Sequence, residues 1–250
     1  MMAKELRFYE RAVAWKDYKD LGFQQKHRID QVISLVPSDS NPVLELGCGF
    51  GYICDRLTKK NVIGVDYSIS TLKHAKCEKV LATCDALPFR NNCFDTVIAS
   101  ELLEHLNDEE LSRTINEIER VSRRYVLITV PYMENPWETF VKCACCGNIF
   151  SPYGHEQFFD EKRVRFLFKK SKCVKILFCS KNRRSLIVKK FVRRLGFYNY
   201  RKNVICTNCG CRRLAHRELS RIITLLVKAI GFILGRTEPL WIFGIYELTK

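Results

Sequence analysis

The sequence predicts an α/β protein built on a doubly wound, mostly parallel sheet of seven strands, with a small cysteine-rich insertion. Short apolar runs alternate with amphipathic segments between residues 43 and 130, which is typical of a parallel sheet covered by helices on both faces. The first run, Val43–Leu46, leads into a glycine-rich turn. The 250 residues are 47% hydrophobic, enough to fill a large core, which excludes a disordered or collagen-like chain.

The expected elements follow one another along the chain. Residues 8–36 read as a helix that Pro37 ends. Residues 94–100 (FDTVIAS) read as a buried strand, and residues 108–121 as a helix because their apolar positions recur at i, i+3 and i+4. Further strands are expected at residues 43–46, 62–65, 80–84, 125–130, 175–179 and 240–248, further helices at residues 52–57, 70–77, 160–170 and 219–234, and a long loop at residues 131–157.

Basic residues outnumber acidic ones and are concentrated in the second half of the chain. The sequence holds 42 Lys and Arg against 27 Asp and Glu, a formal net charge of +15. Between residues 162 and 221 there are 20 basic residues and one acid, Glu218. Such a segment is either a solvated face or a surface for an anionic partner. We expect a partner of the second kind: RNA, a phospholipid or a phosphorylated glycan precursor.

The chain shows no secretory signal and no segment long enough to span a membrane. Residues 1–15 lack an apolar core behind a basic start. The longest apolar stretch, Ile222–Leu234, is shorter than the ~20 residues that a spanning helix needs. We therefore expect a cytoplasmic protein, and the amphipathic helix at residues 219–234 would also allow peripheral binding to an anionic membrane. The oligomeric state stays open.

A glycine-rich turn and two carboxylates mark a candidate ligand site. The turn is ELGCGFG at residues 45–51, and its glycines let the backbone approach a ligand closely. Asp66 ends the next strand, 21 residues after Glu45, where an acidic side chain meets ribose hydroxyls in doubly wound folds. Asp85 follows another 19 residues along the chain. The spacing predicts a nucleotide-like ligand at this edge of the sheet.

Four motifs together, ELGCGFG, VIGVDYS, CDALPF and FDTVIASELLEHL, resemble a class I S-adenosylmethionine-dependent methyltransferase over residues 40–135. The resemblance implies a Rossmann-like methyltransferase fold with S-adenosylmethionine as cofactor. It also implies that the glycine loop faces the methionine part, Asp66 binds the ribose diol, Asp85 binds the adenine amino group and Leu87 packs on the adenine. The cofactor-binding residues expected on this basis are Glu45, Gly47, Gly49, Gly51, Asp66, Tyr67, Asp85, Ala86 and Leu87.

The segment after the fourth strand carries the pattern Glu101-x-x-Glu104-His105, at the carboxyl end of a parallel strand, where ligands bind in such sheets. In one interpretation His105 is a general base and Glu104 positions it or the substrate. In a second, the two carboxylates and the imidazole bind a divalent ion that lowers the pKa of an acceptor hydroxyl. In a third, the group only shapes the pocket.

The E-x-x-E-H pattern also resembles two metal-using groups of O-methyltransferases: those of ubiquinone biosynthesis and those that modify the 2′-hydroxyl at the 3′ ends of small RNAs. The resemblance to the second group implies a further histidine downstream, a role that His155 could fill. The Asp/Asn-Pro-Pro-Tyr/Phe tetrapeptide of amino-methyltransferases is absent after the fourth strand. This absence argues against the N-methylation that relies on it.

These observations favour an enzyme that O-methylates a small molecule or a glycan- or lipid-linked acceptor. The first alternative is an RNA methyltransferase, metal-assisted and acting on the 2′-hydroxyl, that uses the basic cysteine-bearing region. The second alternative is a non-catalytic module that keeps the cofactor fold and binds nucleic acid or a membrane. The acceptor atom stays open.

Two C-x-x-C-G turns occur among the 13 cysteines, which in a chain without an export signal point to thiols or metal ligands rather than disulfides. The first turn holds Cys143 and Cys146, and the second holds Cys206 and Cys209. Two such pairs supply the four ligands of a structural zinc ion. Cys145, within the first turn, and Cys211, after the second, are alternative zinc ligands. The 59 residues between the pairs require the second turn to return to the first in space.

The chain is accordingly divided into four parts. Residues 1–36 form an N-terminal helical cap, and residues 37–135 form the S-adenosylmethionine-binding core. Residues 136–239 form an insertion for substrate binding that contains the zinc knuckles and the basic segment. This insertion surrounds a helix and a strand that complete the sheet. Residues 240–250 form the closing strand.

Overall fold

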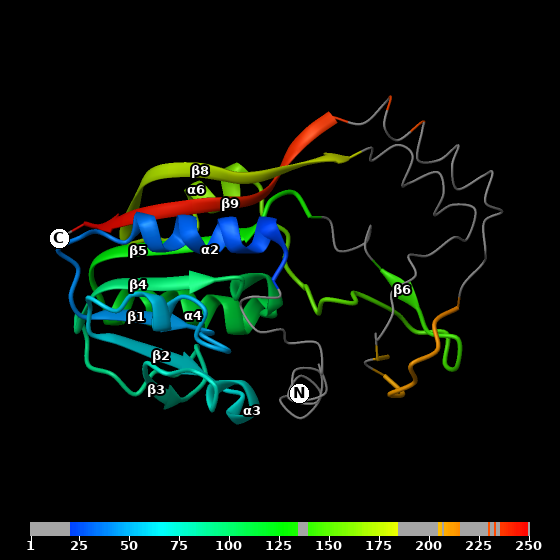
Figure 1. The fold of residues 1–250 in the computed structure, drawn as a ribbon, viewed down its shortest axis with the longest axis horizontal. Helices are drawn as coiled ribbons and strands as arrows, with labels where there is room; N and C mark the ends of the chain where they lie inside the picture. Colours follow the sequence, from blue (N-terminus) through cyan, green and yellow to red (C-terminus); the bar gives the residue numbers. More distant parts are fainter. Residues whose placement is uncertain are drawn as a thin grey trace.

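A seven-stranded sheet organises the computed structural model, in the strand order β3-β2-β1-β4-β5-β9-β8 (Figure 1). The structure describes residues 21–134, 140–184, 205–206, 208–215, 230, 233 and 236–249. The sheet strands are β1 (Val43–Leu46), β2 (Val62–Asp66), β3 (Glu78–Leu81), β4 (Phe94–Ser100), β5 (Ser122–Pro131), β8 (Ser171–Arg184) and β9 (Arg236–Leu248). The predicted class, a doubly wound and mostly parallel α/β sheet of seven strands, is confirmed.

The strand register brings the ends of β1 and β4 together. Five strands, from β3 to β5, run parallel, whereas β9 is antiparallel to both β5 and β8. Every residue of β1 and β4 is buried, as a strand covered on both faces requires. Leu46 lies beside Ala99, so the glycine turn after β1 and the segment after β4 meet at one edge.

Helices cover both faces of this sheet (Figure 1). The N-cap residue of α4, Asn107, accepts hydrogen bonds from the first turn, and Glu110 bonds back to the Asn107 N–H, which forms a capping box. The helix predicted at residues 108–121 is therefore present with the expected bounds. The helices and 3₁₀ turns are α2 (Phe23–Leu35), η2 (Cys54–Arg56), α3 (Ile69–Leu72), η3 (Leu103–His105), α4 (Asp108–Val121) and α6 (Glu161–Arg165).

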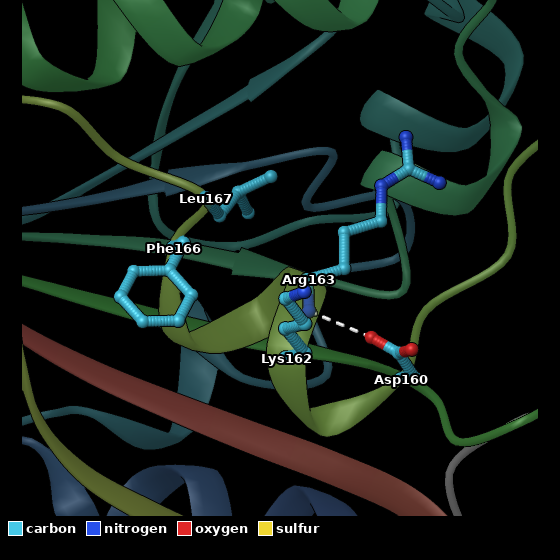
Figure 2. Close-up of a pocket in the computed structure, with 5 residues that line it drawn as sticks. All are labelled: Asp160, Lys162, Arg163, Phe166 and Leu167. Carbon is cyan, nitrogen blue, oxygen red and sulfur yellow. Dashed lines mark hydrogen bonds between the residues drawn. The ribbon is translucent and has the colours of Figure 1, made fainter.

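The short helix α6 lies beside a shallow surface pocket (Figure 2). The Asp160 carboxylate caps the helix by accepting a 2.6 Å hydrogen bond from the Arg163 N–H. Burial of Val164 anchors the helix, and Phe166 is left 72% exposed. None of the residues predicted to bind a cofactor, a metal or a substrate lines this pocket, whose walls are Asp160, Lys162, Arg163, Phe166 and Leu167.

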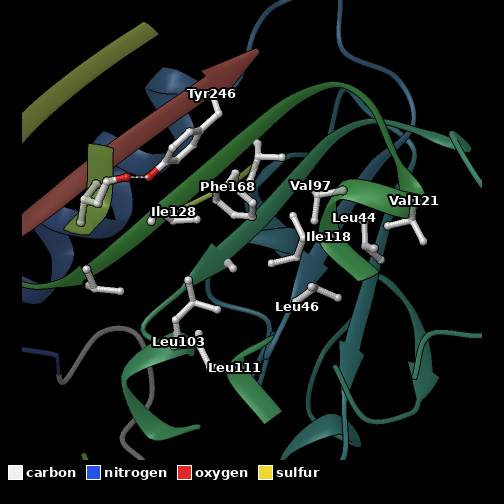
Figure 3. Packing of buried hydrophobic residues seen from close by; sticks show 14 of the residues in the cluster. Leu44, Leu46, Val97, Leu103, Leu111, Ile118, Val121, Ile128, Phe168 and Tyr246 are labelled. Carbon is white, nitrogen blue, oxygen red and sulfur yellow. Dashed lines mark hydrogen bonds between the residues drawn. The ribbon is translucent and has the colours of Figure 1, made fainter. Parts of the chain in front are cut away.

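Alternating side chains of the strands build a core on each face of the sheet. One core packs the sheet against α4 and α6, and the hydroxyl of Tyr246 donates a hydrogen bond to the Val164 carbonyl (Figure 3). The other packs it against α2 and η2. The first core includes Leu44, Leu46, Val97, Ile118, Ile128 and Phe168; the second includes Ile29, Val32, Val43, Ile98, Leu127 and Phe243.

Several helices are shorter than the sequence predicts. The helix expected at residues 52–57 is a single 3₁₀ turn, in which the Arg56 and Leu57 N–H groups donate to the Ile53 and Cys54 carbonyls. The helix expected at residues 70–77 ends at Leu72, and the one expected at residues 160–170 ends at Arg165. Of the helix expected at residues 8–36, the described part begins at Phe23, and residues 1–20 lie outside the description.

The last two strands are longer than the sequence predicts. β8 and β9 pair with each other from Ser171 opposite Leu248 to Arg184 opposite Arg236, and the ribbon extends beyond the rest of the sheet (Figure 1). The loop expected at residues 131–157 also contains a two-stranded hairpin, β6 (Val141–Lys142) with β7 (Ile149–Phe150). Most of the basic segment and of the helix expected at residues 219–234 lies outside the described residues.

Two cysteine pairs depart from the expectation of free thiols. Cys54 and Cys77 are joined by a disulfide, with Cα atoms 6.0 Å apart, and so are Cys145 and Cys211, with Cα atoms 6.6 Å apart. The sequence separations of 23 and 66 residues hide this proximity, which arises only when the loops fold back on each other. Within the described part of the chain, no helix has the length and apolarity needed to cross a membrane.

Candidate functional site

The glycine turn after β1 leaves open space at its centre. Gly47, Gly49 and Gly51 all have positive φ, which disfavours any residue with a Cβ. A Cβ on Gly51 would lie 2.7 Å from the Asp55 carboxylate, and one on Gly47 would lie 3.1 Å from Leu102. A Cβ on Gly49 would meet nothing within 4 Å. The turn is thus packed on both sides and open in the middle, as a ligand cradle is.

Glu45 supports this turn from below. Its side chain is buried, and its Oε2 accepts a 2.8 Å hydrogen bond from the Cys54 N–H. Burial raises the pKa of Glu45 to about 8, although the bond from Cys54 opposes that shift. The predicted cofactor residue Glu45 therefore braces the chain beneath the turn.

Replacing Glu45 with glutamine is expected to change how stability depends on pH. The folded-state pKa of about 8 lies above the ordinary value of 4.5, so the folded protein holds this proton more tightly than the unfolded chain. The free energy of unfolding should therefore fall as pH rises from about 4.5 toward about 8. The glutamine amide stays neutral and still accepts the Cys54 N–H, so Glu45→Gln should flatten this decline. Melting temperatures at pH 5 and pH 8 check it, and equal declines in both proteins would contradict it.

The carboxylates of two further predicted cofactor residues, Asp66 and Asp85, are both held by hydrogen bonds. The Asp66 carboxylate accepts N–H bonds from Gly49 at 2.9 Å and from Ser68 at 2.8 Å, which ties the turn to the end of β2. Burial raises the pKa of Asp66 against the pull of these bonds. Asp85 instead pairs with Arg113 at 2.8 Å. Burial pushes the Asp85 pKa upward, but bonds from Thr83 and Arg113 outweigh it and lower the pKa.

The remaining predicted cofactor residues follow β2 and β3 along the chain. Leu87 is buried, and its N–H donates a 2.7 Å hydrogen bond to the Glu117 carboxylate. Ala86 is exposed next to it, and Tyr67 is half-buried after β2. Of the predicted set, Asp66 thus bonds to the glycine turn, Tyr67 follows β2, and Asp85, Ala86 and Leu87 lie in the segment after β3.

The segment after β4 gathers three groups that could bind a metal. Atoms of Glu104, His105 and His155 that could serve as ligands all lie within 4.8 Å of one another. The Glu104 side chain is 1% exposed, and neither of its carboxylate oxygens has a hydrogen-bond partner. Backbone N–H groups of Glu156 and Gln157 bond to the Glu104 carbonyl at 2.7 and 3.0 Å, which holds the His155 loop against η3.

Burial dominates the electrostatics of this cluster. It raises the pKa of Glu101, and it raises the pKa of Glu104 well above the usual range, where the neighbouring Glu101 charge adds to the effect. It lowers the pKa of His105 to about 3, with His155 contributing. The His105 and His155 rings meet edge to face with centroids 4.8 Å apart. In the absence of a bound metal ion, burial therefore favours the neutral forms of Glu101, Glu104 and His105.

Glu101 stands at the rim of this cluster in a left-handed backbone conformation, with φ of 55°. Its Oε2 accepts a 2.9 Å hydrogen bond from the Trp241 indole, and its Oε1 is buried without a hydrogen-bond partner. The structure thus groups Glu104 and His105 with His155, whereas Glu101 bonds to Trp241 and lies outside that group. Trp241 and Glu134, which contacts His155, are neighbours that the sequence pattern does not include. No local motif marks either residue, since Trp241 comes from β9 and Glu134 from the segment after β5.

Arg28 is another neighbour that sequence reasoning missed. From α2 its guanidinium reaches the ends of β4 and β5, where it donates to Ser100 Oγ at 2.5 Å and to Thr129 Oγ1 at 3.4 Å. It also lies 5.6 Å from the centre of the Trp241 ring. A helix from one end of the chain thus places a cation next to buried carboxylates.

The two cysteine turns come together as the sequence predicts. The sulfurs of Cys143, Cys146, Cys206 and Cys209 lie within 4.8 Å of one another, and the Cys143–Cys209 and Cys146–Cys206 pairs are 3.6 Å apart. Gly147 and Gly210 share a φ of 72°, and each N–H bonds to the carbonyl of the first cysteine of its turn. Four sulfurs on a tetrahedral zinc ion would be about 3.8 Å apart, given Zn–S distances of about 2.3 Å.

Comparisons with known proteins agree with this architecture. Residues 44–128 match a family model described as a methyltransferase domain. A ubiquinone biosynthesis O-methyltransferase of Bartonella tribocorum is 26% identical over 119 residues, covering 43% of this chain and 47% of that protein. Across three curated relatives the match covers 35% to 52% of the relative's length, so the chain spans about a third to a half of the proteins it matches.

Solved structures share the fold at low sequence identity. A SAM-dependent methyltransferase of Thermotoga maritima, a possible histamine N-methyltransferase, superposes with a TM-score of 0.58 at 15% identity and covers 100% of both chains. Magnesium protoporphyrin IX methyltransferase from Synechocystis, solved with bound SAH, has a TM-score of 0.52 at 17% identity, covering 72% of this chain and 87% of its own. These similarities support the fold.

Proposed function

Because residues 44–128 form a class I S-adenosylmethionine-dependent methyltransferase domain, we propose that this chain methylates a hydroxyl oxygen with the help of a divalent cation. One observation carries the proposal: the buried Glu104 carboxylate has no hydrogen-bond partner and lies within 4.8 Å of His105 and His155. Two imidazoles and a carboxylate suit a divalent transition metal, and a second carboxylate, Glu101, lies next to them.

The glycine turn and its neighbours fit S-adenosylmethionine. When bound, this cofactor supplies an electrophilic methyl group on a sulfonium sulfur. The open space at Gly49 admits a ligand close to the backbone. Asp66 retains lone pairs for ribose hydroxyls because a carboxylate offers about four acceptor sites. The pairing of β1 with β4 and the proximity of Leu102 to Gly47 support an arrangement in which the Glu104 cluster lies next to this cradle, so that an acceptor is held beside the methyl group.

A divalent cation on Glu104, His105 and His155 would supply a Lewis acid that lowers the pKa of an acceptor hydroxyl. The residues themselves would hold the hydroxyl in place and keep water away, since Glu104 is almost fully buried. The substrate class we favour is a small hydroxylated molecule or a glycan- or lipid-linked acceptor, in line with the ubiquinone O-methyltransferase relative. RNA 2′-hydroxyl methylation and a non-catalytic binding role are the competing outcomes.

The test is transfer of a labelled methyl group from S-adenosylmethionine to a cell extract that is separated into RNA, lipid-plus-glycan and small-molecule fractions. Label in the small-molecule or lipid-plus-glycan fraction, lost with chelator and restored by Mg²⁺ or Mn²⁺, would support the proposal. Label in the RNA fraction would favour the RNA alternative. Binding of S-adenosylhomocysteine without any transfer would favour the non-catalytic role.

Substitution of Asp66 by alanine is expected to weaken S-adenosylmethionine binding by about 1–3 kcal/mol, because charge-assisted hydrogen bonds to the ribose are lost and the glycine turn loses its tie to β2. Calorimetric titration with S-adenosylhomocysteine measures the change. Asp39→Ala is the matched control, because Asp39 is an exposed carboxylate paired with Arg124. Unchanged affinity in Asp66→Ala would mean that this motif has been misinterpreted.

A structural zinc ion on Cys143, Cys146, Cys206 and Cys209 is the second part of the proposal. The sulfur spacing of 3.6 Å within two of the pairs suits four-sulfur coordination. Such a site has no open position, so the ion would hold the two turns together and take no part in the reaction. The nearby Cys145–Cys211 disulfide leaves these four sulfurs as the ligand set.

A further inference from the structure

A carboxylate outside the E-x-x-E-H pattern bonds to the histidine that completes the cluster. Glu134 Oε2 lies 3.1 Å from His155 Nδ1, and both side chains are largely buried, at 20% and 10% exposure. Glu134 follows β5, whereas His155 lies in the loop before α6. The pair is therefore a tertiary contact between two separate connections at the carboxyl edge of the sheet.

Backbone contacts hold this pair in place. Tyr132 forms a bridge with Phe159, and the Met133 N–H donates a 2.9 Å hydrogen bond to the Phe159 carbonyl. Met133 has a positive φ of 50°, which turns the chain immediately before Glu134. On the other side, the His155 N–H donates to Ser151 Oγ at 3.3 Å. Both partners are thus fixed by their own backbones.

The contact between Glu134 and His155 determines which nitrogen of the His155 ring carries the proton. A carboxylate oxygen can only accept, so Nδ1 of His155 must donate. In a neutral imidazole the other nitrogen, Nε2, then carries the lone pair. Histidines that bind metals commonly donate their second nitrogen to a carboxylate in this way, which sets the tautomer and the ring orientation.

We propose that Glu134 is a positioning residue that fixes His155 as the Nδ1–H tautomer and so presents Nε2 as the ligand of the cation shared with Glu104 and His105. This inference rests on the proposed function for the identity of the cation. The stacked ring of Tyr153, 5.3 Å from that of His155, supports the same orientation. Glu134 itself does not touch the reacting atoms in this assignment; it acts through His155.

The test uses the zinc-loaded chain of 250 residues, titrated with Mn²⁺ alone. Glu134→Ala should raise the Mn²⁺ dissociation constant by about 10–100-fold, as loss of such an outer carboxylate usually does. Glu134→Gln should lie between wild type and alanine, because its amide oxygen still accepts the Nδ1 proton without the charge. Glu156→Ala, which removes the exposed carboxylate next to His155, is the matched control and should bind Mn²⁺ as wild type does.

A second readout separates this role from a general loss of structure. Nitrogen-15 spectra of the His155 ring, recorded without metal, should show one Nδ1–H tautomer in wild type and a mixture in Glu134→Ala. Unchanged S-adenosylhomocysteine affinity confirms that the variant is folded. Either an unchanged tautomer or an unchanged Mn²⁺ affinity in Glu134→Ala would overturn the proposal. If wild type itself binds no Mn²⁺, the metal part of the proposed function fails, and the ring spectrum alone decides the role of Glu134.

Discussion

Replacement of Glu104 by glutamine is expected to lower turnover by about 10²–10⁴-fold while leaving S-adenosylhomocysteine affinity nearly unchanged. The acceptor hydroxyl must lose its proton as it attacks, and either a bound cation or a base must assist. Glutamine has the shape of glutamate but no charge, so it is a poor metal ligand and cannot position a histidine base in the same way. Because the Glu104 side chain is 1% exposed and its oxygens lack partners, the variant should fold at least as well as wild type. Single-turnover methyl transfer and melting temperature measure the two effects.

Controls distinguish the metal from the base interpretation. Glu156→Ala changes a nearby exposed carboxylate and should keep full activity. His105→Ala should lose turnover to a similar degree as Glu104→Gln. Chelator should abolish wild-type activity, and Mg²⁺ or Mn²⁺ should restore it whereas zinc alone should not. Full turnover in both variants, together with indifference to chelator, would leave proximity to the sulfonium as the main source of catalysis.

Substitution of Cys206 by serine is expected to reduce the zinc content from one ion per chain to none. Three thiolates and a hydroxyl hold zinc far more weakly than four thiolates, and structural zinc contributes about 10–16 kcal/mol in small zinc-binding peptides. Cys143 of the first turn and Cys206 of the second form a small hydrophobic core with Val141 and Phe150. Loss of the ion should therefore expose the β6–β7 hairpin to solvent while the large sheet, which has its own two cores, persists.

Metal analysis and hydrogen exchange measure this outcome. Amides of residues 141–150 should exchange much faster in Cys206→Ser, and those of β4 and β5 should not change. Cys173→Ser is the matched control, since this cysteine has no paired spacing and lies in β8. If the wild-type protein contains no zinc and the hairpin amides still exchange slowly, the proposed zinc site is wrong.

Local sequence signals predict the centre of the sheet well. Phe94–Ser100 is apolar enough to be read as a buried strand, and it is buried along its whole length. Asp108–Val121 has a clear helical repeat and begins directly after a capping residue. In these segments the local preference and the tertiary environment agree, so the bounds are predicted correctly.

Features that depend on pairing between distant segments could not be predicted in this way. β8 contains several lysines and β9 begins with charged residues, so a prediction based on apolar runs covers only part of each strand. Val141–Lys142 and Ile149–Phe150 are too short to be recognised as strands, and they pair only because the cysteine turn folds back between them. The contacts of the candidate site with Glu134 and Trp241 likewise arise from tertiary folding.

The long β8–β9 ribbon has a consequence for how this chain can change over evolution. Arg184 and Arg236 are direct partners at its far end, so the segment between them leaves and re-enters the sheet at a single point. The entropy of closing such a segment grows only slowly with its length. Descendants could lengthen or shorten the stretches on either side of the second cysteine turn without rethreading a strand, as long as Cys206 and Cys209 still meet Cys143 and Cys146. The acceptor preference and the binding partners of related proteins could therefore diverge quickly around an unchanged cofactor-binding half.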